Sequence, residues 1–204
     1  MIVRRAVASD LGATALLLGS AFADDPWTRW CVDADDHVRR ITELQHISLE
    51  VIGLRFGQVW LAEHETNVVS AAVWSDSRID LDDSLFVELS ERSTPLHGER
   101  LTAAAAAETG GFGRPATAHL FLETMATHPD LRRRGLGARV LQPGLALADE
   151  LGLLCGLETS TEGNVEFYRT VGFEVVHHRV VTHRDQRGPD VWTMSREPHR
   201  SAIG

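Results

Sequence analysis

Two patterns of apolar residues alternate along the chain. Short stretches in which apolar residues alternate with polar ones, or run together, predict strands. These cover residues 2–7, 58–62, 68–74, 118–127, 153–158, 173–182 and 191–196. Longer stretches with apolar residues every three or four positions predict helices. These cover residues 10–23, 35–56, 80–90, 99–108, 135–151 and 165–171. Because helices and strands are interspersed from end to end, we expect an α/β fold.

The length of 204 residues, 43% of them hydrophobic, suits a single domain with an adequate core. We expect that domain over residues 1–197, a disordered tail over residues 198–204, and a flexible connection at residues 110–113. Pro143 lies inside the helix predicted for residues 135–151. It removes one backbone hydrogen bond and can bend the helix, but it predicts nothing about function.

Composition narrows the possible partners and the compartment. Twenty basic residues against 29 acidic ones give a net charge of −9, which argues against a nucleic-acid partner and suits a cationic small molecule. Two cysteines cannot form a disulfide framework, and neither a secretory signal nor a membrane-spanning stretch is evident. We therefore expect a cytoplasmic protein, monomeric or homodimeric, that binds no membrane. The histidines form no metal-binding pattern, so no metal is expected.

The segment HPDLRRRGLGA (residues 128–138) stands between a predicted strand and a predicted helix. Free N–H groups at a helix N-terminus, together with the helix dipole, favour an anion there. Glycine lets the backbone approach a phosphate, and arginine can bind phosphate oxygens in pairs. The alternative is an arginine run that is simply solvated. The chain contains no lysine, which excludes a P-loop, and Val140 stands where a dinucleotide fingerprint needs glycine.

The spacing R-x-x-G-x-G at Arg132, Gly135 and Gly137 resembles the pyrophosphate-binding motif of the GNAT superfamily of acyl-CoA N-acyltransferases. The segment LETSTEGNVEFYRTVGFEVV (residues 157–176) resembles that superfamily's second motif, with Asn164 and Tyr168 in the expected places. The resemblance implies the GNAT fold, in which helices flank both faces of a single mixed, mostly antiparallel sheet. It also implies acetyl-CoA as the cosubstrate.

The resemblance further implies how acetyl-CoA would be held. The backbone of Met125, Ala126 and Thr127 would pair with the pantetheine arm, where the strand separates from its neighbour. The phosphates would lie against a loop and helix start formed by Arg132, Arg133, Arg134, Gly135, Leu136, Gly137 and Ala138. Asn164 would open the short helix that follows and bond the pantetheine; the alternative is a simple helix cap.

Tyr168 is the sole tyrosine of the chain. In the superfamily this position usually holds the general acid that protonates the departing thiolate. A phenol with an ordinary pKa near 10 keeps its proton at neutral pH and can serve as that donor. The alternative is an aromatic side chain that only packs a helix against the sheet.

Two carboxylates are candidates for receiving the proton of the acceptor amine. Alternation along the predicted strand places Glu123 on one face with His119, Phe121 and Met125. A carboxylate inside an apolar strand is costly unless it is paired or functional. The alternative for Glu123 is a partly exposed or arginine-paired side chain. Glu158, at the end of the next predicted strand, is the second candidate.

Aromatic residues flank the Asp24-Asp25-Pro26 break. Phe22, Trp27 and Trp30 could wall an acceptor site together with Glu123, because aromatic rings beside acids suit a cationic amine. The alternative is ordinary packing between the first two helices. Four segments, over residues 20–45, 56–63, 134–152 and 156–176, resemble the puromycin N-acetyltransferases and their actinobacterial relatives, and the likeness extends over most of the chain. The sequence departs from their pattern at Asp25, Trp27, Trp30 and Glu123, so the resemblance does not identify the acceptor amine.

We therefore predict an acetyl-CoA-dependent N-acetyltransferase acting on the primary amine of a small molecule, with an aminonucleoside-type antibiotic as one candidate. Two other functions remain open at this point. One is an acyl-CoA-binding regulatory module without significant catalysis, which would need neither Tyr168 nor an acceptor pocket. The other is a protein or peptide N-acetyltransferase.

Overall fold

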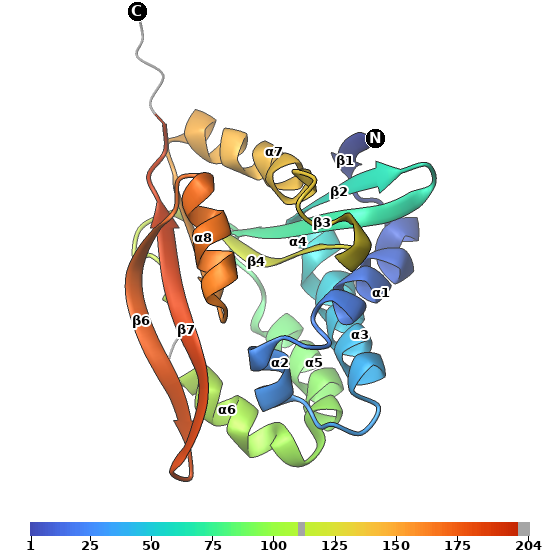
Figure 1. Cartoon of the computed structure of the whole chain (residues 1–204), viewed down its shortest axis with the longest axis vertical. Coiled ribbons are helices and arrows are strands. Elements are labelled where there is room, and N and C mark those ends of the chain that lie inside the picture. The colour runs from blue at the N-terminus through green and yellow to red at the C-terminus, as the bar shows by residue number, and fades with distance from the viewer. Residues whose placement is uncertain (110–112, 200–204) are drawn as a thin grey trace, which may run out of the picture.

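The computed structural model describes residues 1–109 and 113–199, which form one layered assembly around a twisted sheet (Figure 1). The helices are α1 (Leu11–Ala21), α2 (Pro26–Cys31), α3 (His37–Ser48), α4 (Leu54–Phe56), α5 (Asp83–Ser93), α6 (Leu101–Thr109), α7 (Leu136–Leu151) and α8 (Glu162–Thr170). The strands are β1 (Ile2–Arg5), β2 (Gln58–His64), β3 (Asn67–Asp76), β4 (His119–Thr127), β5 (Leu154–Thr159), β6 (Glu174–His183) and β7 (Gln186–Arg196).

Across the described ranges the strands form a single seven-stranded sheet in the order β1-β2-β3-β4-β5-β7-β6. Every neighbouring pair is antiparallel except β4 and β5, which run parallel. A parallel pair needs a crossover connection, and α7 provides it. The prediction of one mixed, mostly antiparallel sheet flanked by helices is therefore confirmed.

Helices cover both faces of this sheet and bury different sets of strand residues. On one face Trp74, Leu120 and Leu122 pack with Val140 and Leu145 of α7, and α8 extends the same layer. On the other face α1 packs against β3 and β4, and α3 lies behind α1. The short helices α2 and α6 pack against the β6–β7 hairpin (Figure 1).

Two element boundaries differ from the sequence-based expectation for a local reason. The helix predicted over residues 35–56 is instead α3, a π-helical turn over Leu49–Gly53, and α4. After the Asp24-Asp25-Pro26 break the chain forms a further helix, α2, which the pattern did not predict. Asp25 caps it by accepting a hydrogen bond from the Trp27 N–H, and Pro26 is its first residue. Asp followed by Pro is a helix-start signal, because proline is preorganised at the first helical position.

The expected alternation along β4 is wrong beyond Phe121 because the strand contains a β-bulge. Leu122 pairs with Trp74 and Thr124 with Val73, so Glu123 has no partner residue on β3. An extra residue reverses the phase of the side chains that follow. Met125 consequently packs on the same face as Leu120 and Leu122 rather than with Phe121.

Helix α7 continues through Pro143, and the next residue, Gly144, lies against the fully buried ring of Trp74. A Cβ built on Gly144 would overlap the indole.

Replacing Gly144 by Ala is therefore expected to lower the free energy of unfolding by about 2 kcal/mol, a typical cost of overpacking. Gly12 in α1 is the matched control, because nothing lies within 4 Å of its added Cβ. Urea unfolding should show Gly12→Ala unchanged or slightly stabilised; a similar loss in both variants would contradict the prediction.

Two predicted segments fall mainly outside the described residues. Of the connection at residues 110–113 only Gly113 is described, and of the tail at residues 198–204 only Pro198 and His199. The His199 N–H donates a hydrogen bond of 2.8 Å to Asp149 of α7. Within the ranges that the structure covers, no helix is long and apolar enough to cross a membrane.

Candidate active site

The central feature of the site is a separation between the two parallel strands. β4 and β5 pair from His119 with Leu154 to Leu122 with Leu157, and beyond this point each strand pairs only with its outer neighbour. The His128 N–H donates to Val69 of β3, so by the alternation of a strand the N–H groups of Thr127 and Met125 point away from β3. The gap thus presents free backbone groups to an extended ligand.

The loop between β4 and α7 forms one end of this gap. Gly135 begins α7 as its N-cap in the left-handed conformation, with φ 74°, and no side chain caps the helix. The N–H groups of Leu136, Gly137 and Ala138 belong to the first turn and have no intrahelical acceptor. An added Cβ on Gly135 would meet nothing within 4 Å, so the space in front of the helix is open. This arrangement favours an anion by both hydrogen bonding and dipole.

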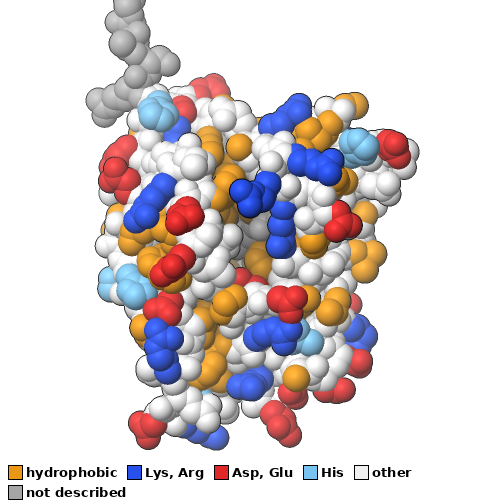
Figure 2. All heavy atoms as spheres, viewed as in Figure 1, with side chains coloured by type: hydrophobic (Ala, Val, Ile, Leu, Met, Phe, Trp, Pro, Cys, Tyr) orange, Lys and Arg blue, Asp and Glu red, His pale blue; other side chains and the backbone are white. Residues whose placement is uncertain are grey.

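Arginines surround the same helix start. Arg132, Arg133, Arg134 and Gly135 are all exposed. Arg132 also lies between two elements, because its guanidinium contacts the carbonyls of Thr127 and of Ala21 at 3.4 Å each. Figure 2 shows basic side chains gathered beside a hollow in this face of the molecule. The loop therefore combines positive charge with free N–H groups.

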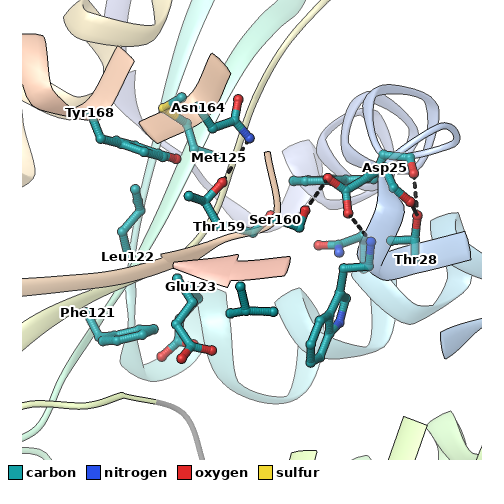
Figure 3. A pocket seen from close by; sticks show the side chains of 16 residues that line it. Asp25, Thr28, Phe121, Leu122, Glu123, Met125, Thr159, Ser160, Asn164 and Tyr168 are labelled. Atoms are coloured by element: carbon teal, nitrogen blue, oxygen red, sulfur yellow. Dashed lines mark hydrogen bonds between the residues drawn. The ribbon is translucent and has the colours of Figure 1, made fainter. Parts of the chain in front are cut away.

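Tyr168 projects from α8 toward the other end of the gap, with its hydroxyl directed toward the cavity (Figure 3). Its ring packs edge-on against Phe167 and Phe173, with centroids 5.2 and 5.8 Å away, and only 7% of the residue is exposed. No described residue forms a hydrogen bond with its hydroxyl. Burial raises the pKa of the phenol because the phenolate would be poorly solvated. The group therefore keeps its proton at neutral pH.

Asn164 does not open α8, contrary to one reading of the sequence. The cap is Thr161, whose side chain accepts from the Asn164 N–H, and the helix begins at Glu162. The Asn164 side chain instead extends to the cavity wall and donates to the Thr159 hydroxyl at 3.0 Å (Figure 3). A threonine precedes the helix at a position where its hydroxyl can satisfy a free N–H, which is the local signal the sequence offered.

The separated strands open into a cavity of about 240 Å³. Its wall includes Phe22, Asp25 and Trp27 from the first helices, Glu123, Thr124 and Met125 from β4, and Glu158, Thr159 and Tyr168 from the second motif. Trp30 does not line it. That side chain packs against Gly188 of β7 and borders a separate, more open depression. The structure therefore brings Phe22 and Trp27 to the cavity and leaves Trp30 outside.

Glu123 lies at the bulge but is already paired. Both of its carboxylate oxygens accept from Arg114 at 2.9 Å, Ser75 donates a further hydrogen bond, and its side chain is 34% exposed. This is the arginine-paired arrangement that the sequence left open. The bulge removes Glu123 from the apolar face, which is why a carboxylate is tolerated within this strand.

Glu158 is more deeply placed, with a side chain 11% exposed. One oxygen accepts from the Gly113 N–H and from Thr193, at 3.0 Å each. The other lies 3.8 Å from Arg179 of β6, whose guanidinium is 6.0 Å from the centre of the Trp27 ring. Glu158 is thus held on the cavity wall by neutral donors and one cation.

A third carboxylate, Asp25, also lines the cavity, and the sequence analysis did not propose it as a site residue. Besides capping α2, it accepts a hydrogen bond of 2.8 Å from Ser160, which follows β5 (Figure 3). Burial raises the pKa of Asp25, and its hydrogen bonds from Ser160 and Trp27 oppose that rise only in part. The Asp-Pro step was visible in the sequence, but the contact with Ser160 was not.

The comparisons with known proteins agree with this geometry. The family model for the acetyltransferase (GNAT) family matches residues 54–173. The chain belongs to the GNAT acetyltransferase family. The matched stretch of this GNAT N-acetyltransferase contains β4, the arginine-glycine loop, α7 and α8 with Tyr168. The segment of α1 and α2 that carries Phe22, Asp25 and Trp27 lies outside it.

Solved structures of other acetyltransferases share the fold. One from Corynebacterium glutamicum, described as a histone acetyltransferase and related acetyltransferase, is 23% identical with a TM-score of 0.72, covering 98% of each chain. A polyamine N-acetyltransferase from Drosophila melanogaster is 18% identical, with a TM-score of 0.60 over 96% of this chain and 99% of its own. An acetyltransferase from Salmonella typhimurium with acetyl-CoA is 16% identical, with a TM-score of 0.56 over 100% and 97%. At these identities the likeness concerns the fold alone.

The described residues contain no group of three or more His, Cys, Asp or Glu side chains that could hold a metal ion. The thiols of Cys31 and Cys155 are both buried. The cavity wall presents hydrogen-bond donors, carboxylates and one phenol.

Proposed function

We propose that this GNAT enzyme transfers the acetyl group of acetyl-CoA to the primary amine of a small, cationic molecule bound in the cavity between β4 and β5. The observation that carries the proposal is the content of this cavity. Its volume is about 240 Å³, and its wall combines the rings of Phe22 and Trp27 with three carboxylates. Aromatic rings and carboxylates favour an ammonium group.

Acetyl-CoA fits the remaining features of the site. Its phosphates would be held by the free N–H groups of Leu136, Gly137 and Ala138, with charge from Arg132, Arg133 and Arg134. Its pantetheine arm would pair with the backbone of Met125 and Thr127, since the Ala126 backbone faces β3, and Asn164 would bond the same arm. When bound, acetyl-CoA supplies the activated thioester. Tyr168 would then donate its proton to the departing sulfur.

The small cavity favours a small-molecule acceptor over a protein substrate, because a peptide backbone needs an extended groove. The resemblance to puromycin N-acetyltransferases makes an aminonucleoside antibiotic one acceptor to test. The net charge of −9 supports a cationic substrate through long-range attraction. We infer a cytoplasmic enzyme, where acetyl-CoA is available and the buried thiols stay reduced.

The test is an acetyl-CoA turnover screen over agmatine, polyamines, arylalkylamines, amino acids, puromycin and short peptides. We expect release of free CoA that depends on one class of small cationic amine, and little response to peptides. Reactions without amine provide the baseline of thioester hydrolysis. If no amine raises CoA release above that baseline, the proposed acceptor chemistry is wrong, and an acyl-CoA-binding module is favoured.

A further inference from the structure

The three carboxylates on the cavity wall differ in whether a cation already neutralises them. Glu123 is bound by Arg114 through both oxygens, and Glu158 lies 3.8 Å from Arg179. Among the described residues, no arginine or histidine forms an ion pair with Asp25. The neighbouring Asp24 pairs with Arg29, but its side chain is 89% exposed and points to solvent. Asp25 is thus the one carboxylate of the cavity wall that forms no ion pair within residues 1–109 and 113–199.

The position of Asp25 is set from two distant parts of the chain. Its Oδ1 accepts the Trp27 N–H at 2.9 Å, which ties the side chain to the start of α2. Its Oδ2 accepts the Ser160 hydroxyl at 2.8 Å, which ties it to the loop between β5 and α8. Figure 3 shows Asp25 and Tyr168 on opposite sides of the space they border, with Ser160 and Thr159 between them. The carboxylate is therefore held in place before any acceptor arrives.

Asp25 is half-buried, and a carboxylate in such a place that is bound only by neutral donors is incompletely compensated. The hydrogen bonds from Trp27 and Ser160 stabilise its charge, but they leave lone pairs on both oxygens. The pKa of Asp25 is raised by burial, so a proton placed on it would be held more firmly than on an exposed aspartate. An ammonium group supplies both the missing positive charge and a proton to transfer.

The other ionisable groups around the cavity are less suited to this task. Glu123 on β4 and Glu158 on β5 already interact with arginines. Arg179 of β6 lies beside Trp27 and is directed to Glu158 rather than to Asp25. Tyr168 of α8 keeps its proton because its pKa is raised. Asp24 and Arg29, the nearest charges on the same segment, pair with each other at the surface.

We propose that Asp25 binds the ammonium group of the acceptor and removes one proton from it before acetyl transfer, with Ser160 as a positioning residue. This rests on the amine-acetyltransferase function proposed above. In the step, one N–H bond of the ammonium breaks and an O–H bond forms on the Asp25 carboxylate. The electron pair stays on nitrogen, which becomes a neutral nucleophile. Asp25 thus carries the first proton that nitrogen loses, and Tyr168 supplies a different proton to sulfur. The second proton, which nitrogen loses as the amide forms, replaces the one that Tyr168 has given up.

Asp25→Asn tests the proposal with little change in shape, because asparagine can still accept the Trp27 N–H and cap α2. Agmatine, a strongly basic amine, and puromycin, with a weakly basic α-amino group, are the acceptors. Near neutral pH we expect kcat/KM for agmatine to fall about 100-fold, and for puromycin to fall less, since more of it is already neutral. The kcat/KM of the variant should rise with pH along the ionisation of each amine itself. Asp24→Asn, the matched control, should behave as wild type.

Ser160→Ala tests the positioning role through the pH profile. The Ser160 hydroxyl stabilises the carboxylate, so its removal raises the pKa of Asp25 further. Because Asp25 must be ionised to take the proton, the acidic limb of kcat/KM should move to higher pH, with a smaller change on the alkaline side. A role in packing alone would lower the rate equally at every pH.

The outcomes separate this proposal from the function on which it rests. If wild type acetylates neither these acceptors nor any other amine of the screen, the proposed function fails and the role of Asp25 with it. If wild type is active and Asp25→Asn is equally active, the function stands and the role of Asp25 is wrong. Equal losses for both amines at every pH, or an acidic limb that Ser160→Ala leaves in place, would also overturn it.

Discussion

Replacing Tyr168 by Phe is expected to lower kcat by about 1000-fold, within the usual range for loss of a general acid, while acetyl-CoA affinity stays nearly unchanged. The phenylalanine ring can keep the contacts with Phe167 and Phe173, so the fold should tolerate the change. What is lost is the proton donor to the departing thiolate. Because no described residue hydrogen-bonds the hydroxyl, its removal leaves no buried partner unsatisfied.

Two measurements check this prediction. Calorimetric titration with CoA measures affinity, and steady-state kinetics with an active amine measures kcat. Tyr168 is the sole tyrosine, so the ultraviolet signal of phenol ionisation reports its pKa directly. Burial raises that pKa, and the protonated form should therefore persist above pH 10, with no alkaline loss of activity from this group at lower pH. Equal kcat in the two proteins would remove Tyr168 as the acid.

Replacing Gly135 by Asp is expected to weaken acetyl-CoA binding by about 1000-fold. The new carboxylate would stand before the free N–H groups that open α7 and repel the phosphates of the cofactor. Loss of one or two charge-assisted hydrogen bonds, at about 1.5–3 kcal/mol each, is enough for an effect of this size. The backbone at Gly135 is left-handed, with φ 74°, so an aspartate there is strained. That strain is present both with and without bound acetyl-CoA.

Gly152 provides the matched control for this substitution. It ends the same helix, also in the left-handed conformation, with φ 66° and nothing within 4 Å of an added Cβ. Gly152→Asp therefore introduces the same charge and the same backbone strain at the far end of α7. Both variants should lose stability, because aspartate tolerates this conformation only partly, and because a negative charge opposes the helix dipole at Gly152. In calorimetry only Gly135→Asp should lose affinity for acetyl-CoA; equal affinities would contradict the anion site.

The sequence alone was sufficient for those features that depend on neighbours along the chain. Apolar periodicity indicated the strands and most helices, because each element must bury one face at its own spacing. The arginine-glycine loop was recognisable because an anion site at a helix start needs only a few consecutive residues. Tyr168 and Asn164 belonged to a second local motif. The resemblance of these motifs to the GNAT superfamily agrees with the family match over residues 54–173.

Only the tertiary structure decided how the carboxylates are used. The bulge at Glu123 depends on the register between β3 and β4, and its ion pair depends on where Arg114 lies. Asp25 and Ser160 are 135 positions apart in the sequence, so no local pattern could reveal the hydrogen bond between them. Local periodicity determines which residues form an element and which face is apolar. Which charges are neutralised depends on side chains brought together from separate elements, and over the part of the chain that the structure describes this leaves Asp25 without a cation.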